Sequence, residues 1–450
     1  MTTAAYAVVD PATGAVVKEY AVATDTDIDA ALATAHEAYR EWSTTGLADR
    51  AAVVARIGEL HAERAGALGA IISREMGKPL DQAVGEVEFS AEIYAYYARN
   101  AATFLADQPI TLAAGEGEAL IRRQPIGALL GVMPWNYPAY QVARFAAPNL
   151  VLGNTIVLKH AAQCPESSAA IEQILLDAGL PPGGYTNVYA TKAQVARAIA
   201  DPRIVGVSFT GSESAGAVIA ETAGRNLKKV VLELGGSDPF IVFSTDDLEA
   251  TIEAALDARF ENTGQACNGA KRFIVADHLY DEFVERFTRK ALARGTGLSP
   301  LSSTAAATHL QGQLDRAVAE GATLARAGRT DGAYFPPAVL TDVEPSSPSA
   351  AEEHFGPVAT IYRFHSEAEA IELANSTAYG LGSYVFTTDP EQADRVADRI
   401  EAGMVFVNGV GLDAAELPFG GIKRSGFGRE LGSLGIEEFA NRKLIRTVSR

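Results

Sequence analysis

A single cysteine in a glycine-containing segment is the first residue in this sequence that suggests chemistry. Cys267 lies in ENTGQACNGAKRF, where Gly264 and Gly269 leave the backbone free to approach a bound molecule closely. A thiolate is a strong nucleophile, and a helix N-terminus or nearby positive charge lowers the pKa of a cysteine. Taken alone, such a cysteine is more often a small buried apolar residue. Cys164, in HAAQCPES, lacks these surroundings, and we interpret it as structural.

Two polar residues elsewhere strengthen the interpretation of the cysteine as a nucleophile. Glu233, in LELGGSDP, is expected at the end of a strand, where ligands and catalytic groups gather in α/β sheets. A carboxylate held there among apolar neighbours could act as a general base at neutral pH. Asn136, in VMPWNYP, lies between Pro134 and Pro138, which restrict the backbone. An amide held rigidly is a suitable hydrogen-bond donor to an oxyanion.

A glycine turn provides a third candidate segment. The stretch SFTGSESAG (208–216) has the pattern of a strand, a glycine turn and the start of a helix. Gly211 and Gly216 give the spacing GxxxxG rather than GxGxxG, so the standard dinucleotide-binding fingerprint is absent. This pattern alone is more often a turn than a cofactor site.

The composition excludes several classes of partner. The chain has 450 residues and a formal net charge of −18, so nucleic acid and anionic membrane surfaces are not expected as partners. No stretch of about 18 consecutive apolar residues is present, and the N-terminus lacks the features of a signal peptide. The two distant cysteines and seven histidines without HxH or HxxxH spacing indicate neither a disulfide framework nor a metal site. We therefore expect a cytoplasmic enzyme of two or three domains without a bound metal.

The first hundred residues predict amphipathic helices. Apolar residues recur at helical spacing from Ile28 to Trp42, behind Thr26 as the N-cap. A second helix is expected over 51–76 and a third over 80–104. The tyrosines of the third helix are expected to pack in the core.

From residue 128 onward, short apolar runs alternate with helical segments, which is the pattern of βαβ units in a parallel sheet. Residues 108–123 have the period-two alternation of an exposed hairpin, and residues 295–303 are expected to form a loop. The chain is thus expected to form two α/β halves with the reacting groups between them. The expected strands cover 128–133, 155–159, 186–189, 205–209, 230–234, 271–275, 359–364, 383–386 and 404–408.

Six ordered motifs resemble those of the aldehyde dehydrogenase superfamily. They are PWNYP, FTGS, LELGG, GQAC, EEHFGP and PFGGIKRSGFGRE, and they occur in the family's order and spacing from about residue 5 onward. The 34 positions between Glu233 and Cys267 also match the family pattern. Within the superfamily, the segments GNTIVLKHA, ELGGSDPFIVF and AKRFIV are similar to the short bacterial succinate-semialdehyde dehydrogenases.

The resemblance implies the α/β aldehyde dehydrogenase fold. In that fold a Rossmann-like parallel-sheet cofactor domain would comprise residues 1–106 and 126–235. An α/β catalytic domain would comprise residues 236–425. A small β oligomerisation element would comprise the hairpin at residues 107–125 and the tail at residues 426–450. Family members usually form homodimers or homotetramers through these two segments.

The resemblance also implies a reaction. Cys267 would attack an aldehyde, and Asn136 with the Cys267 backbone N–H would hold the oxyanion. After hydride transfer to a nicotinamide, Glu233 would activate the water that hydrolyses the thioester. Branches that pass the acyl group to coenzyme A typically lack this carboxylate, so release of the free acid is expected. The implied cofactor-binding residues are Trp135, Lys159, Ala162, Thr210, Gly211, Ser212, Gly216, Leu234, Glu353 and Phe355.

The residues after Lys159 bear on the choice between NAD and NADP. NAD-preferring members often carry a Glu three residues later, where it accepts from the adenosine 2′-hydroxyl. Here Ala162 takes that place, so a 2′-phosphate meets no repulsion, and His160 and a nearby helix N-terminus could favour the anion. The sequence leaves both cofactors open and slightly favours NADP.

For the substrate, the resemblance points to succinic semialdehyde, which would be oxidised to succinate. Arg144 falls eight residues after Asn136, at the position that binds the distal carboxylate of the substrate in that group. A fixed guanidinium suits a carboxylate through bidentate hydrogen bonds. Tyr137 and Phe419 complete the expected substrate site.

Two positions depart from this pattern and leave alternatives open. Glu261 stands six residues before Cys267, where many semialdehyde dehydrogenases have a second Arg, and Ala414 replaces a common hydroxyl residue. Another aliphatic aldehyde or an amino aldehyde is therefore the alternative substrate. Outside the family, a cysteine hydrolase or acyltransferase that uses Cys267 stays open, as does a catalytically inactive homologue.

Overall fold

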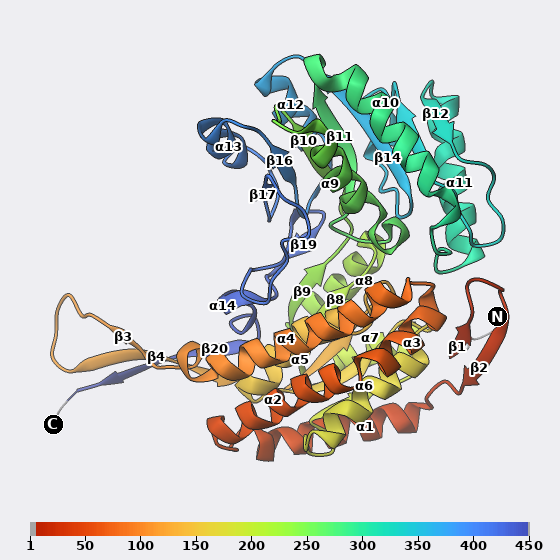
Figure 1. Ribbon diagram of the computed structural model, residues 1–450. Coiled ribbons are helices and arrows are strands. Elements are labelled where there is room, and N and C mark those ends of the chain that lie inside the picture. The colour runs from red at the N-terminus through yellow and green to blue at the C-terminus, as the bar shows by residue number, and fades with distance from the viewer. Residues whose placement is uncertain (1–5, 449–450) are drawn as a thin grey trace.

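The computed structural model describes residues 6–448, so residues 1–5 of the predicted cofactor domain and residues 449–450 of the predicted tail lie outside the described part. Figure 1 shows two α/β lobes and a narrow sheet that projects from one of them.

Six strands form the sheet of the first lobe. In spatial order they are β19 (Gly426–Phe427), β9 (Lys229–Glu233), β8 (Ile204–Thr210), β5 (Ala128–Val132), β6 (Thr155–Lys159) and β7 (Tyr185–Asn187). All neighbours are parallel except β19, which pairs antiparallel with β9. Strand order reverses between β5 and β8, and ligands of such sheets bind beyond the carboxyl ends of the strands at this point.

Helices cover both faces of this sheet, which explains why β5 is buried along its whole length. Leu130 packs in the core with α1, α7 and α8, and Leu129 packs in the core with the other helices. The helices are α1 (Asp25–Trp42), α2 (Leu47–Glu63), α3 (Ala65–Met76), α4 (Leu80–Phe104), α5 (Tyr140–Leu152), α6 (Pro165–Asp177), α7 (Lys192–Ala200) and α8 (Glu213–Arg225).

The second lobe contains a seven-stranded sheet. In spatial order its strands are β12 (Thr323–Arg326), β13 (Ala338–Thr341), β14 (Val358–Phe364), β11 (Ala270–Ala276), β10 (Asp238–Val242), β16 (Tyr384–Phe386) and β17 (Phe406–Val407). Only β12 is antiparallel to its neighbour. The lobe also contains α9 (Leu248–Phe260), α10 (Asp277–Ala293), α11 (Thr304–Ala319), α12 (Glu367–Asn375), α13 (Pro390–Ala397) and the short helices η1 (Glu261–Gly264), η2 (Arg294–Thr296) and η3 (Pro348–Ala351).

The projecting sheet joins distant parts of the chain. β20 (Ala440–Thr447) pairs antiparallel with β4 (Glu118–Pro125), which pairs with β3 (Gln108–Ile110). Figure 1 shows this sheet extending away from both lobes. The remaining elements are β1 (Tyr6–Val9), β2 (Val16–Tyr20), β15 (Tyr379–Gly380), β18 (Ile422–Lys423) and α14 (Gly432–Gly435).

The two α/β halves and the hairpin predicted from the sequence are confirmed, and α4 has the predicted bounds. The predicted N-cap Thr26 was wrong, because the N-cap is Thr24, two residues earlier, which forms a reciprocal capping box with Asp27. The helix predicted over 51–76 is divided at Arg64, where φ is −109° and ψ is 12°. The prediction missed β10, which begins with Asp238 and Pro239, residues that are depleted in strands.

The described residues contain neither a membrane-spanning helix nor a cluster of metal-binding side chains. No helix in this part of the chain is long and apolar enough to cross a membrane. No cluster of three or more His, Cys, Asp or Glu side chains that could hold a metal ion is present among residues 6–448.

Gly131 tests how tightly the first lobe is packed. A Cβ on this residue of β5 would lie 2.7 Å from Leu158 Cδ1 and 2.8 Å from Phe145 Cε1. We expect Gly131→Ala to lower the free energy of unfolding by about 1–3 kcal/mol, measured by urea denaturation. Gly85→Ala in α4 is the matched control: its Cβ would contact nothing within 4 Å, and helix propensity predicts a gain of up to about 1 kcal/mol. Equal effects of the two substitutions would contradict this packing.

Candidate active site

Cys267 lies in the loop between η1 and β11. The preceding backbone is sharply bent, because Asn262, Thr263 and Gly264 have left-handed φ values of 48°, 55° and 77°. Such conformations cost free energy in residues with a Cβ, so surrounding contacts must hold them. One contact is the hydrogen bond from Asn262 Nδ2 to the backbone oxygen of Asn136, at 3.0 Å. The loop of the cysteine is thereby fixed to the other lobe.

Asn136 follows β5 and is held by two hydrogen bonds. Its Nδ2 donates to the backbone oxygen of Gln265 at 3.1 Å, and its Oδ1 accepts from Gln141 Nε2 at 3.0 Å. The second contact fixes the orientation of the amide, because only the oxygen can accept it. One N–H of the amide remains for a ligand.

Glu233 is the last residue of β9 and is buried. Neither of its carboxylate oxygens has a hydrogen-bond partner in the described part of the chain. Burial and the nearby Glu430 raise the pKa of Glu233 well above its usual range, and Arg144 acts against this shift. A Cβ on Gly420 would lie 2.8 Å from Glu233 Oε1, so glycine leaves room for the carboxylate.

The Cys267 thiol is weakly acidic in these surroundings. Burial raises its pKa to about 12, whereas the cations Arg144 and Lys271 lower it. The cysteine therefore rests as a thiol, and positive charge or a base must favour the reactive thiolate.

A cavity of about 620 Å³ brings the candidate catalytic groups together, because Asn136, Glu233 and Cys267 all line it. Lys159, Ala162 and Gly216 are not among its lining residues. The other predicted cofactor residues line it: Trp135, Thr210, Gly211, Ser212, Leu234, Glu353 and Phe355.

This cavity has the features of a dinucleotide site. Ser212 caps the N-terminus of α8, where backbone N–H groups favour a phosphate. A Cβ on Gly216 would lie 2.5 Å from Leu234 Cδ2, so this glycine lets the helix approach the strand closely. Thr210 Oγ1 is buried without a partner among the described residues. Glu353 Oε1 accepts from the N–H of Gly236 at 3.1 Å. These residues fit a dinucleotide.

The predicted adenosine end holds a pair of cations. Burial, together with the nearby Lys192, lowers the pKa of Lys159 to about 8. The prediction that His160 could favour an anion was wrong. The ring is fully buried and contacts the backbone oxygen of Pro138 at 3.0 Å, and burial lowers its pKa to about 4, so it stays neutral.

The three predicted substrate residues lie near one another but outside the lining of the 620 Å³ cavity. Arg144 is buried in α5, with Nε 2.8 Å from Glu430 Oε2 and its guanidinium 4.1 Å above the centre of the Phe419 ring. Its Nη2 has no hydrogen-bond partner within residues 6–448. Tyr137 donates from its hydroxyl to Glu261 Oε1 at 3.0 Å.

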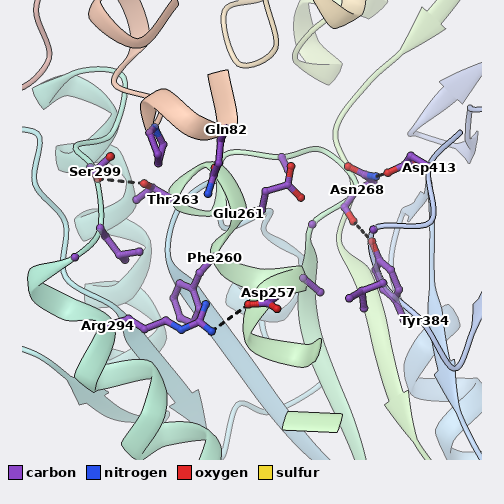
Figure 2. A pocket seen from close by; sticks show the side chains of 18 of the residues that line it. Gln82, Asp257, Phe260, Glu261, Thr263, Asn268, Arg294, Ser299, Tyr384 and Asp413 are labelled. Carbon is purple, nitrogen blue, oxygen red and sulfur yellow. Dashed lines mark hydrogen bonds and ion pairs between the residues drawn. The ribbon is translucent and has the colours of Figure 1, made fainter. Parts of the chain in front are cut away.

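A second cavity, of about 520 Å³, adjoins the Cys267 loop, because Ala266 and Asn268 line it. Figure 2 shows Asn268 among the residues that line this cavity. Glu261 and Asp413 also line it, and neither forms an ion pair within the described part of the chain. Tyr137 donates a hydrogen bond to Glu261, and Asn268 Nδ2 donates to Asp413 Oδ2 at 3.5 Å. This cavity therefore presents acidic groups that neighbouring polar side chains hold by hydrogen bonds, without a cation paired to either of them in the described part of the chain.

The sequence analysis missed the residues that hold the candidate catalytic groups. Gln141 and Gln265 fix Asn136, and Lys271 binds backbone oxygens around Cys267. Gln265 and Lys271 fall within the quoted segment ENTGQACNGAKRF, but nothing in that pattern indicates which atoms they contact.

Comparisons with known proteins agree with this geometry. The model of the aldehyde dehydrogenase family matches residues 1–445. A protein of Deinococcus radiodurans named succinate-semialdehyde dehydrogenase (NADP+) is 50% identical, over 98% of this chain and 94% of its own. A crystal structure of succinic semialdehyde dehydrogenase from Streptococcus pyogenes in complex with NADP+ is 39% identical, with a TM-score of 0.96, and the match covers 99% of this chain and 100% of that one. This chain belongs to the aldehyde dehydrogenase family.

Proposed function

We propose that this enzyme oxidises succinic semialdehyde to succinate with NADP as the cofactor, through a thioester on Cys267. The convergence of Cys267, Glu233 and Asn136 on one cavity with a dinucleotide cradle carries the proposal. The relatives from Deinococcus radiodurans and Mycobacterium avium, 50% and 42% identical to this chain, support it, because both are named succinate-semialdehyde dehydrogenase (NADP+).

In the proposed first step, the Cys267 thiolate attacks the aldehyde carbon and forms a thiohemiacetal. The negative charge that develops on the aldehyde oxygen accepts hydrogen bonds from Asn136 Nδ2 and the backbone N–H of Cys267. Gln141 holds the amide of Asn136 in the required orientation before substrate binds, so no reorganisation is needed during reaction.

The cofactor site is proposed to use the glycine turn, Trp135, Glu353 and Phe355. A nicotinamide bound there supplies the acceptor for the hydride of the thiohemiacetal. Trp135 and Phe355 meet edge to face with ring centroids 5.7 Å apart, which makes a rigid apolar wall for this end of the cavity. Glu353 is held by the N–H of Gly236 and is proposed to contact a ribose hydroxyl.

Glu233 is proposed to complete the reaction. Its carboxylate has free oxygens and a raised pKa, so it can take a proton from water as that water attacks the thioester. The products are the free acid and the Cys267 thiol. The base works in its charged form, so the raised pKa predicts that turnover increases as pH rises towards that pKa.

The proposed carboxylate contact is Arg144. Its buried Nη2 lacks a hydrogen-bond partner in the described part of the chain, and its charge affects the pKa of both Cys267 and Glu233. A buried unpaired guanidinium N–H is unfavourable, and a substrate carboxylate would satisfy it.

A second substrate class follows from the 520 Å³ cavity. Glu261 and Asp413 would repel a carboxylate that entered beside Asn268 and would attract a cation. An amino aldehyde is therefore the alternative substrate.

We further propose that residues 107–125 and 426–450 mediate assembly into a homodimer or homotetramer, with residues 1–106 and 126–235 as the cofactor domain and 236–425 as the catalytic domain. Leu444 in β20 is 62% exposed on the projecting sheet, which supports a partner there. A cytoplasmic location is proposed because Cys164 and Cys267 are both free thiols.

Glu233→Gln tests the hydrolysis step. The amide keeps the shape but cannot accept the proton, so we expect one burst of reduced cofactor and a steady-state kcat lower by about 10²–10⁴-fold. Rapid-mixing absorbance gives the burst, and intact mass gives the acyl group on Cys267. Glu221→Gln, on the exposed face of α8, is the control. An unchanged steady-state rate would rule out this role of Glu233.

A panel of succinic semialdehyde, butanal and 4-aminobutanal tests the substrate. We expect the highest kcat/KM with succinic semialdehyde, and Arg144→Met should lower its ratio to that of butanal by about 100-fold through loss of the carboxylate contact. The substitution also leaves Glu430 without its ion-pair partner, which would lower kcat/KM for both aldehydes alike. The ratio of the two values is unaffected by such a general loss. Preference for 4-aminobutanal, lost in Glu261→Gln, would establish the alternative instead.

Ala162→Glu tests the cofactor. A carboxylate at this position should repel a 2′-phosphate, so we expect the ratio of kcat/KM for NADP to that for NAD to fall by about tenfold or more, equivalent to about 1.4 kcal/mol. Ala161→Glu is the neighbouring control. An unchanged ratio in Ala162→Glu would place the 2′-phosphate elsewhere.

A further inference from the structure

Lys271, the second residue of β11, has its ammonium group enclosed by the loop that carries the nucleophile. Its Nζ donates to the backbone oxygens of Ala266, Cys267 and Gly269 at 2.9, 2.8 and 3.2 Å. An ammonium has three N–H donors, so these three oxygens satisfy all of them. The side chain is 1% exposed, which rules out a role in contact with solvent.

The lysine also contacts the proposed cofactor site. Glu353 Oε1 lies 3.4 Å from Lys271 Nζ and accepts a hydrogen bond from Gly236 N–H. A Cβ on Gly236 would lie 2.6 Å from the backbone oxygen of Cys267, so the backbone that follows β9 packs directly against the cysteine loop. One cation thus touches both the cysteine loop and the carboxylate proposed to bind a ribose.

The contact with Ala266 has a consequence for the N–H of Cys267. The oxygen of Ala266 and the nitrogen of Cys267 belong to the same peptide unit, and no cis peptide occurs among the described residues. In a trans peptide the C=O and N–H bonds point in opposite directions. The ammonium that binds this oxygen therefore sets the direction of the Cys267 N–H, which forms no hydrogen bond within residues 6–448.

The charge of Lys271 acts on the thiol as well. It lowers the pKa of Cys267 against the larger effect of burial. The charged groups that face the thiol are the cations Arg144 and Lys271 and the carboxylates Asp238 and Glu353, with Glu233 lining the same cavity.

We propose that Lys271 is a positioning residue that aims the Cys267 N–H for the oxyanion and supplies buried positive charge for the thiolate. This inference rests on the proposed function, because the oxyanion is that of the aldehyde. It assigns to a lysine on the second lobe the task that Gln141 performs for Asn136 on the first. The two oxyanion donors are thereby fixed independently, one by an amide and one by a cation.

The test separates the charge of Lys271 from its geometry. Lys271→Met removes both, and Lys271→Arg keeps the charge but cannot direct three donors from one atom. The first readout is the rate constant for alkylation of Cys267 by iodoacetamide at about pH 8 in the enzyme without cofactor or aldehyde, followed by mass spectrometry of the Cys267 peptide. Below the pKa of the thiol this rate constant is proportional to the fraction of thiolate. The second readout is kcat at saturating aldehyde and cofactor. Lys290→Met, a partly exposed lysine of α10 that pairs with Glu253, is the control and should match the wild type in both.

In Lys271→Met we expect the alkylation rate constant to fall by about tenfold or more and kcat to fall by about 10²–10³-fold. In Lys271→Arg we expect the alkylation rate constant to stay near the wild-type value while kcat falls by at least about tenfold. An alkylation rate constant and a kcat both equal to the wild type in folded Lys271→Met would overturn the proposal. If Lys271→Met does not fold cooperatively, Lys271→Arg decides: a wild-type kcat in that variant also overturns it.

The two readouts distinguish this inference from the proposed function. Alkylation needs neither an aldehyde nor a cofactor. If the wild type oxidises no aldehyde while the alkylation rate constant of Lys271→Met still falls, the proposed function fails and the action of Lys271 on the thiol stands. If the wild type oxidises succinic semialdehyde and both Lys271 variants match it, only the role of Lys271 fails.

Discussion

The hydrogen bonds between the Asn136 loop and the Cys267 loop are the constraint on which the rest of the structure depends. Asn136 Nδ2 donates to the backbone oxygen of Gln265, and Asn262 Nδ2 donates to the backbone oxygen of Asn136. The proposed nucleophile belongs to the second lobe, whereas its proposed oxyanion donor and base belong to the first. A shift of one lobe against the other would leave these buried amides unpaired, at about 1–3 kcal/mol for each. These hydrogen bonds therefore hold the two lobes in one relative position.

Buried charge is arranged in two groups around this junction. Arg144 and Glu430 form an ion pair close to Glu233, and Lys271 and Glu353 form an ion pair close to Cys267. Burial raises the pKa of both candidate catalytic groups, so both are protonated more readily than in water. Arg144 opposes this effect at both sites, and Lys271 also opposes it at Cys267. A substitution of Arg144 is therefore expected to change both groups together, whereas a substitution of Lys271 acts on Cys267.

The sequence predicted the fold and the main catalytic candidates because these leave local patterns. Buried parallel strands such as β5 are continuous apolar runs, and Cys267 and Glu233 lie in recognisable motifs. It could not predict the break at Arg64, because the helical apolar pattern continues across it and the nearby Gly58, Gly66 and Gly69 lie inside α2 and α3 rather than at the break. The orientation of His160 was also beyond the sequence, because its contact with Pro138 depends on the packing of β6 against the loop after β5. In the sequence, Lys271 looks like any lysine near a strand. Only the structure shows that the loop folds around its ammonium group.

Two strands near the C-terminus complete sheets whose other strands come from much earlier parts of the chain. β20 pairs residues 440–447 with residues 118–125, and β19 places Gly426 beside Glu233 at the edge of the first sheet. A nascent chain emerges from its N-terminus, so the strand of the proposed base has an open edge until residues 426–427 leave the ribosome. A chain cut short before that point would expose an unpaired strand edge, which is a template for aggregation. Premature termination would therefore yield a product that cellular quality control can recognise, rather than a partly active enzyme.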